Sequence, residues 1–148
     1  MEILLVVVGK IKEEYYRNKI KHYVTESNKH NKMTVIELED ESIPKNAGDN
    51  ISQIIKEKEG IKILEKIEKN DYVVALCIEG VLTDTDKLRM VIDKAKNNQN
   101  KRVVFIIGGS LGLHDMVTRR ADYKLSFSKM TFPHQLMRVM LLEQLAKL

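Results

Sequence analysis

Short runs of apolar residues recur along the chain, and each is followed by a stretch with a one-sided helical pattern. The runs are residues 2–8, 33–38, 72–78, 103–107 and 123–127. They are rich in β-branched and aromatic side chains, and runs of this length are typical of strands buried on both faces. Residues 33–38 alternate between apolar and polar instead, a pattern also typical of a strand. The pattern therefore predicts five strands.

The stretches between these runs predict helices at residues 12–26, 51–67, 84–96 and about 114–120, with a last helix that begins near Pro133. Thr83 is the expected N-cap of the third of them, with Asp86 close to a capping-box position. Strands that alternate with helices predict a three-layer α/β domain with a mostly parallel sheet. The polar stretch 39–50 is a surface loop on this interpretation, so residues 1–148 form a single domain.

Composition adds few constraints. The net charge of +4 over 148 residues inclines the surface only mildly toward polyanions such as RNA. With one cysteine, Cys77, no disulfide framework is expected, and its apolar neighbours indicate a core residue. No apolar run reaches membrane-spanning length, and we expect a cytoplasmic protein without a membrane anchor. The spacing of the four histidines and Cys77 resembles no metal site, so we expect no metal.

Three loops follow predicted strands and carry the candidate chemistry: residues 79–80, 108–112 and 126–133. In open parallel sheets, ligands bind beyond the carboxyl ends of the strands, so these loops can meet at one pocket if their strands are neighbours. Gly108, Gly109 and Gly112 are expected to allow positive φ and close approach to a ligand. Their G-G-x-x-G pattern matches neither the dinucleotide nor the phosphate-loop motif, and a plain tight turn stays the alternative.

His134 and Arg138 lie four residues apart in the last predicted helix, with a helical stripe through Leu136, Val139, Met140 and residues 143–145. This spacing places both side chains on one face. Two donors together could hold a phosphate or a developing anion. The alternative for His134 is a surface or capping residue at the start of the helix.

Beyond spacing, the residues themselves resemble a known family. The segments IGGSLGL (107–113) and RADYKLSFSKMTFPHQLMRVMLLEQL (120–145) are similar to SPOUT-class RNA methyltransferases. Within that class they resemble the ribosomal RNA large subunit methyltransferase H family, which acts on N3 of a pseudouridine. VGKIKEEYY (8–16), KEKEGIKIL (56–64) and ALCIEG (75–80) extend the resemblance over nearly the whole chain.

The resemblance implies an α/β fold with a deep trefoil knot at its carboxyl end, an exception to the rule against threading. It implies a homodimer whose substrate is helix 69 of large-subunit rRNA, presented in the ribosome. S-adenosylmethionine would lie in the knot, and His134 would handle the proton or orient the base. Arg138 would bind RNA phosphate or steady the uracil anion, and Lys129 would add phosphate attraction. The implied cofactor-binding residues are Leu76, Gly108, Phe127, Ser128, Lys129, Met130, Thr131 and Phe132.

Two departures from the family pattern bear on these expectations. Relatives often carry an acidic residue at the position of Cys77. They also continue beyond the counterpart of Leu148 with a tail that ends in Tyr-His and a basic residue, and we expect RNA affinity and full activity to depend on that tail. A relative that binds RNA and cofactor without turnover is therefore the main alternative to a methyltransferase. A nucleotide-binding module without RNA is a third.

Overall fold

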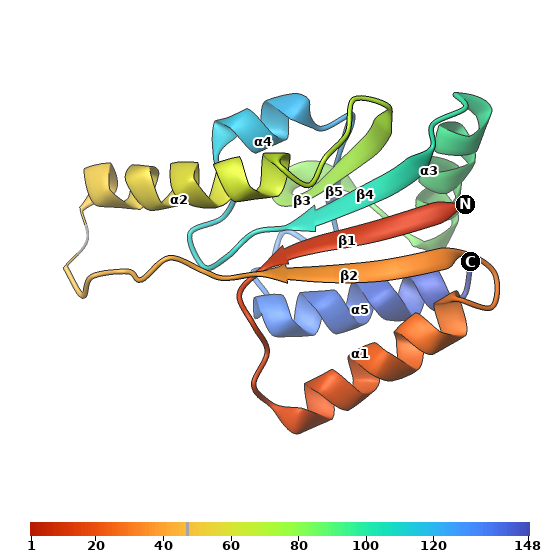
Figure 1. The fold of residues 1–148 in the computed structure, drawn as a ribbon, viewed down its shortest axis with the longest axis horizontal. Helices are drawn as coiled ribbons and strands as arrows, with labels where there is room; N and C mark the ends of the chain where they lie inside the picture. The colour runs from red at the N-terminus through yellow and green to blue at the C-terminus, as the bar shows by residue number, and fades with distance from the viewer. Residues whose placement is uncertain (47) are drawn as a thin grey trace.

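The computed structural model describes residues 1–46 and 48–148 and contains one five-stranded sheet (Figure 1). All strand pairs are parallel, and their order is β2-β1-β4-β3-β5. The strands are β1 (Glu2–Val8), β2 (Lys32–Leu38), β3 (Asp71–Leu82), β4 (Arg102–Ile107) and β5 (Tyr123–Ser126). The predicted parallel sheet is thereby confirmed, and β4, β3 and β5, which precede the three candidate loops, are neighbours.

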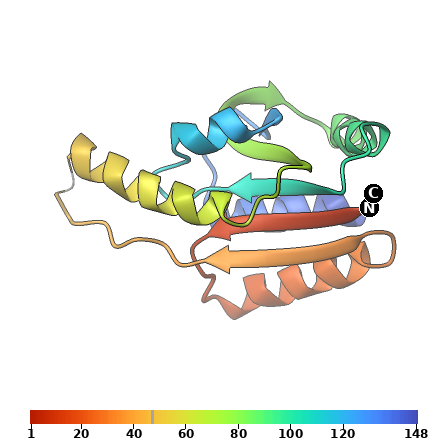
Figure 2. The ribbon, with the colours of Figure 1, turned by 45° about the horizontal axis from the view of Figure 1, so that its top comes forward.

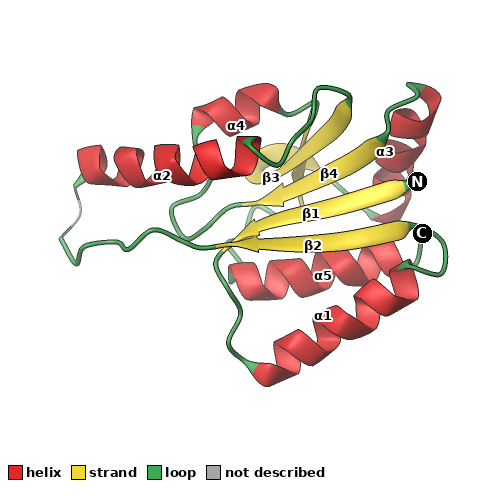
Figure 3. Ribbon diagram, in the orientation of Figure 1, coloured by secondary structure: helices red, strands yellow, loops and turns green. Residues whose placement is uncertain are grey.

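Helices cover both faces of the sheet, which gives the predicted three layers (Figures 2 and 3). One face carries α1 (Glu14–Ser27), α3 (Thr85–Asn97) and α5 (His134–Ala146), whose apolar residues join one core cluster with the strands. The other face carries α2 (Asp49–Leu64) and α4 (Asp115–Arg120), which contact each other. The interior strands β1 and β4 are buried on both faces, as their continuous apolar runs predicted.

Strand β3 runs farther than predicted. We expected it to stop at Ile78, but it continues to Leu82 after an irregularity between Leu76 and Val81, both of which pair with Leu125 of β5. Gly80 lies in this irregularity, where an added Cβ would be 2.8 Å from the backbone N and C atoms of Leu125. The glycine therefore lets β3 bulge against β5 instead of ending the strand.

Gly80→Ser should lower the free energy of unfolding by about 1–3 kcal/mol, because the new side chain overlaps backbone that cannot move without breaking the β3–β5 pairing. Urea denaturation measures this change. Gly48→Ser is the matched control, because no atom lies within 4 Å of its Cβ position and serine is a favoured residue at this N-cap of α2. Equal losses in the two variants would contradict the close approach at Gly80.

The N-cap of α3 also differs from prediction. Asp84, not Thr83, caps the helix, and its carboxylate accepts a hydrogen bond from the backbone N–H of Lys87 at 2.8 Å. Thr83 instead continues the β3–β5 connection, because its N–H donates to the carbonyl of Ser126 at 3.0 Å. The N-cap of α3 is one residue later than predicted because β3 extends beyond the apolar run 72–78 to Leu82.

Candidate functional site

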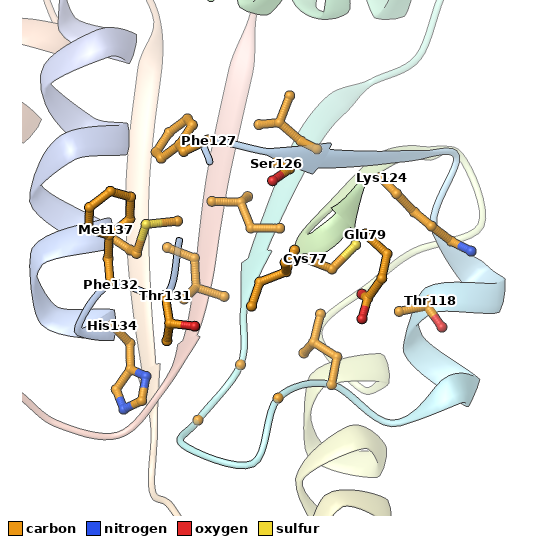
Figure 4. Close-up of a pocket in the computed structure, with 18 of the residues that line it drawn as sticks. Cys77, Glu79, Thr118, Lys124, Ser126, Phe127, Thr131, Phe132, His134 and Met137 are labelled. Carbon is orange, nitrogen blue, oxygen red and sulfur yellow. The ribbon is translucent and has the colours of Figure 1, made fainter. Parts of the chain in front are cut away.

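A cavity of about 740 Å³ lies beyond the carboxyl ends of β3, β4 and β5 (Figure 4). All three loops expected to converge contribute to its lining, from residues 76–79, from residues 107–113 and from residues 124–128 and 130–132. Its size is in the range of small-molecule sites. The prediction that neighbouring strands bring these loops to one pocket is confirmed.

The glycine turn (residues 108–112) forms one wall. The N–H of Gly112 donates to the carbonyl of Gly109 at 3.0 Å, and Gly112 has φ +84°. The expectation of positive φ was wrong for Gly108 and Gly109. Glycine is required at these two positions because neighbouring atoms leave little room for a side chain. A Cβ on Gly108 would lie 2.9 Å from a methyl carbon of Leu113, and one on Gly109 would lie 3.3 Å from Val8. The turn is thus folded tightly on itself and on β1.

The cover segment (residues 127–132) forms another part of the wall. It begins with a turn in which the Ser126 hydroxyl donates to the carbonyl of Ser128 at 2.9 Å. The hydroxyl oxygen of Ser128 accepts from the N–H of Met130 at 3.0 Å. Of the eight predicted cofactor residues, seven line the cavity: Leu76, Gly108, Phe127, Ser128, Met130, Thr131 and Phe132. Lys129 is exposed and is absent from the lining.

The two sides of the cavity differ in character (Figure 4). Phe127, Phe132 and Met137 lie on the side of α5, whereas Glu79, Thr118 and Lys124 gather on the side of α4. The first side can cover a flat apolar group, and the second offers charges and a hydroxyl. A ligand with an aromatic ring and a charged end would match this division.

Sequence reasoning missed part of the lining. Cys77 was assigned to the core, but it is half-buried and lines the cavity, where burial and the nearby Glu79 raise the pKa of its thiol. Its position near the carboxyl end of a predicted strand, two residues before a candidate loop, was the available signal. Lys56 of α2 and Thr118 of α4 also line the cavity. They come from the two helices on the sheet face opposite α5. Nothing in the sequence of either helix indicates that its side chains reach this cavity.

His134 is the first residue of α5 and lines the cavity, half-buried, as predicted. Burial lowers the pKa of its imidazole, and the positive charge of Arg138 lowers it further, against a smaller opposing effect of Asp40. The neutral imidazole, which can accept a proton, is therefore favoured at neutral pH.

Arg138 lies elsewhere. Its side chain is 2 % exposed and does not line this cavity, because it belongs to the core face of α5 with Leu141, Leu142 and Leu145. The predicted stripe was right at Leu145, which is fully buried, and wrong at Leu136, Val139 and Met140, which are only partly buried. That part of the stripe was misplaced because Arg138 was expected to face a ligand together with His134, and not the core. The structure does not bring the guanidinium to the pocket beside His134.

Among residues 1–46 and 48–148, no group of three or more His, Cys, Asp or Glu side chains is placed to hold a metal ion. Over the same residues, none of the helices combines the length and apolar character needed to cross a bilayer.

Comparison with known proteins gives the family. The family model described as "Predicted SPOUT methyltransferase" matches residues 1–147. Three similar relatives are each called "Ribosomal RNA large subunit methyltransferase H". That of Clostridioides difficile strain 630 is 50 % identical over 98 % of this chain and 91 % of its own length. Those of Clostridium acetobutylicum and Bacillus pumilus are 48 % and 46 % identical, each over 97 % of this chain and 91 % of their own. This chain belongs to the SPOUT methyltransferase family and is an enzyme that transfers a methyl group.

Proposed function

We propose that the protein transfers the methyl group of S-adenosylmethionine to N3 of a pseudouridine in helix 69 of large-subunit ribosomal RNA. The observation that carries the proposal is the one cavity that the glycine turn, the cover segment and His134 line together. The names of the relatives support ribosomal RNA as the substrate. Helix 69 and the N3 position follow from the motif resemblance of residues 107–145.

The residues of the cavity fit S-adenosylmethionine. The donor supplies an electrophilic methyl group on a sulfonium sulfur. Phe127, Phe132 and Leu76 offer apolar cover for an adenine ring, and the exposed backbone of the glycine turn offers donors and acceptors for the polar atoms. On the α4 side, Glu79 and Lys124 carry the charges that would pair with the ammonium and carboxylate of the methionine end.

Within this arrangement the chain needs to orient N3 toward the methyl carbon and to remove one proton. As N3 forms its bond to the methyl carbon, the bond from sulfur to that carbon breaks and the N3 proton is released. His134 would accept this proton through its neutral imidazole, which the lowered pKa favours. Lys129, exposed in the cover segment, would attract an RNA phosphate at the mouth of the site.

His134→Ala should lower turnover by about 100-fold, the contribution of a positioned general base. The dissociation constant for S-adenosylmethionine should change by less than about threefold, because the backbone and aromatic contacts remain. In the wild type, activity should persist below pH of about 6.5 and fall only at lower pH, because protonation of His134 abolishes its role as acceptor. Rate–pH profiles check this, and turnover of the variant within about threefold of wild type would contradict it.

The same proposal includes a homodimer, a trefoil knot and a cytoplasmic location, where ribosomes are found. Apolar side chains beside the cavity support a partner subunit, since Ile78, Val81, Leu82 and Met130 are between 47 % and 69 % exposed. Supporting the knot, β5 is the edge strand on one side of the sheet, whereas Arg138 of α5 contacts β1 near the other side. The chain between them returns across the sheet next to the glycine turn.

Ribosomes that lack the modification, incubated with the protein and radiolabelled S-adenosylmethionine, test the function directly. The expected result is one label per large subunit, located by nuclease digestion and mass spectrometry at a pseudouridine N3 of helix 69. Cofactor binding without label in RNA would instead support the non-catalytic relative. Absence of cofactor binding by calorimetry would overturn both.

A further inference from the structure

The guanidinium of Arg138 is a junction between three segments that are far apart in sequence. Nη2 donates to the carbonyls of Val8 at 2.9 Å and Gly9 at 2.7 Å, and Nη1 donates to Glu37 Oε2 at 3.1 Å. The same Glu37 oxygen accepts from the N–H of Ile11 at 3.0 Å. The carboxyl ends of β1 and β2 and the loop after β1 are thus held to α5 by one partly buried ion pair and the hydrogen bonds around it.

The backbone is shaped for this junction. Gly9 has φ +98°, and a Cβ at Gly9 would lie 3.6 Å from Nη2 of Arg138, in contact with the guanidinium. The Gly9 N–H donates to the carbonyl of Leu38 at 2.7 Å, so the turn is tied to β2 as well. Arginine reaches these three acceptors with two nitrogens of its forked guanidinium. Lysine has a single donor nitrogen and cannot reproduce this geometry.

This junction lies one helical turn from His134. The N–H of Met137 donates to the carbonyl of Pro133 at 3.1 Å, which closes the first turn of α5 between the two residues. A helix end is otherwise prone to fraying. Fixing Arg138 to β1 and Glu37 therefore fixes the direction in which His134 enters the cavity.

We propose that Arg138 is a positioning residue, which with Glu37 anchors the first turn of α5 so that His134 faces the methyl-transfer site. The proposal rests on the proposed function and replaces a direct contact of Arg138 with RNA. Its charge has a second effect, since it helps to keep His134 neutral, while Asp40 from the loop after β2 acts in the opposite direction. The other charged groups that line the cavity are Lys56, Glu79, Asp115 and Lys124.

Four variants separate positioning from RNA binding and from general damage: Arg138→Met, Arg138→Lys, Glu37→Gln and the control Arg89→Met. Arg89 lies on α3 in an exposed pair with Asp86, outside the site. Arg138→Met should lower kcat by about 100-fold, the cost of a misplaced catalytic group, with KM for ribosomes and cofactor affinity within about threefold of wild type. Arg138→Lys should recover part of kcat, Glu37→Gln should lose less than Arg138→Met, and Arg89→Met should match wild type.

The pH profile gives a readout that mere loosening would not produce. Removing the positive charge in Arg138→Met should move the acidic limb of the rate to higher pH, whereas Arg138→Lys keeps the charge and the limb. Glu37→Gln keeps the positive charge of Arg138, so the acidic limb of its rate–pH profile should not move to higher pH. A normal kcat in Arg138→Met, or a loss confined to KM for ribosomes, would overturn the proposal.

An NMR titration of the His134 ring in the free protein tests the same charge effect without activity. The imidazole should titrate at higher pH in Arg138→Met than in wild type, and at the wild-type pH in Arg138→Lys. If ribosomes are not methylated by the wild type, the function fails, and this titration still decides whether Arg138 acts on His134. If Arg138→Met does not fold, the kcat values of Arg138→Lys and Glu37→Gln test the proposal instead. A wild-type kcat in both variants would overturn the proposal that Arg138 and Glu37 anchor α5.

Discussion

Gly108→Val should strongly weaken binding of the methyl donor. A Cβ at Gly108 would lie 2.9 Å from Leu113 and 3.0 Å from the carbonyl carbon and oxygen of Gly112, and valine adds two further methyl groups. The glycine turn would have to open, which changes the wall of the cavity. We expect the dissociation constant for S-adenosylmethionine to rise by about 100-fold or more, or about 2.7 kcal/mol, measured by calorimetry.

Gly112→Asn is the control within the same turn. No atom lies within 4 Å of its Cβ position, and asparagine tolerates the left-handed conformation that φ +84° requires. Its affinity should stay within about tenfold of wild type. Wild-type binding in Gly108→Val would show that the turn does not shape the donor site, and equal losses in both variants would show that the crowding at Gly108 is not the reason.

Asp71→Ala should be the most destabilising single change away from the site. The Asp71 side chain is fully buried and accepts from Nε of Arg102 at 2.7 Å, from its Nη2 at 3.0 Å and from the N–H of Glu68 at 2.7 Å. Alanine leaves the mostly buried Arg102 cation without its carboxylate. Breaking such a pair costs about 3 kcal/mol or more, which urea denaturation measures as a drop in the free energy of unfolding.

Asp86→Ala is the contrasting variant, because Asp86 pairs with Arg89 in solvent, with a side chain 89 % exposed. Its loss should be below about 1 kcal/mol. Both variants should keep the wild-type affinity for S-adenosylmethionine, since neither residue lines the cavity. A loss below about 1 kcal/mol in Asp71→Ala would contradict the buried network.

The presence of five strands was predictable because burial on both faces leaves continuous apolar runs such as residues 103–107, whereas their order in the sheet was not predicted. The bulge at Gly80 was not predictable, because the second half of β3 is exposed and mixes polar with apolar residues. Arg138 shows the same limit. Its place in the core depends on carbonyls of Val8 and Gly9, some 130 residues earlier, and no local pattern reports such a partner.

The part of the site that is built from strand-end loops and from the sequence motifs could be predicted from the sequence. Neighbouring strands bring their following loops together, so the glycine turn and the cover segment were expected to meet if their strands were neighbours, and the family resemblance placed His134 at the same site. Lys56 and Thr118 reach the cavity through packing of α2 and α4. Their contribution depends on the angle at which helices cross the sheet, which the residues of one helix do not specify.

The buried pair of Asp71 and Arg102 joins the first residues of β3 and β4, at the amino-terminal edge of the sheet, whereas the cavity opens at the carboxyl-terminal edge. Substitutions at the two ends of the strands should therefore affect different properties: stability at the amino-terminal edge and activity at the carboxyl-terminal edge. A variant selected for survival at high temperature can accumulate substitutions at the first edge and retain its catalytic rate. One selected for a new methyl acceptor would have to vary the second edge, and would draw on the stability reserve that the first edge maintains.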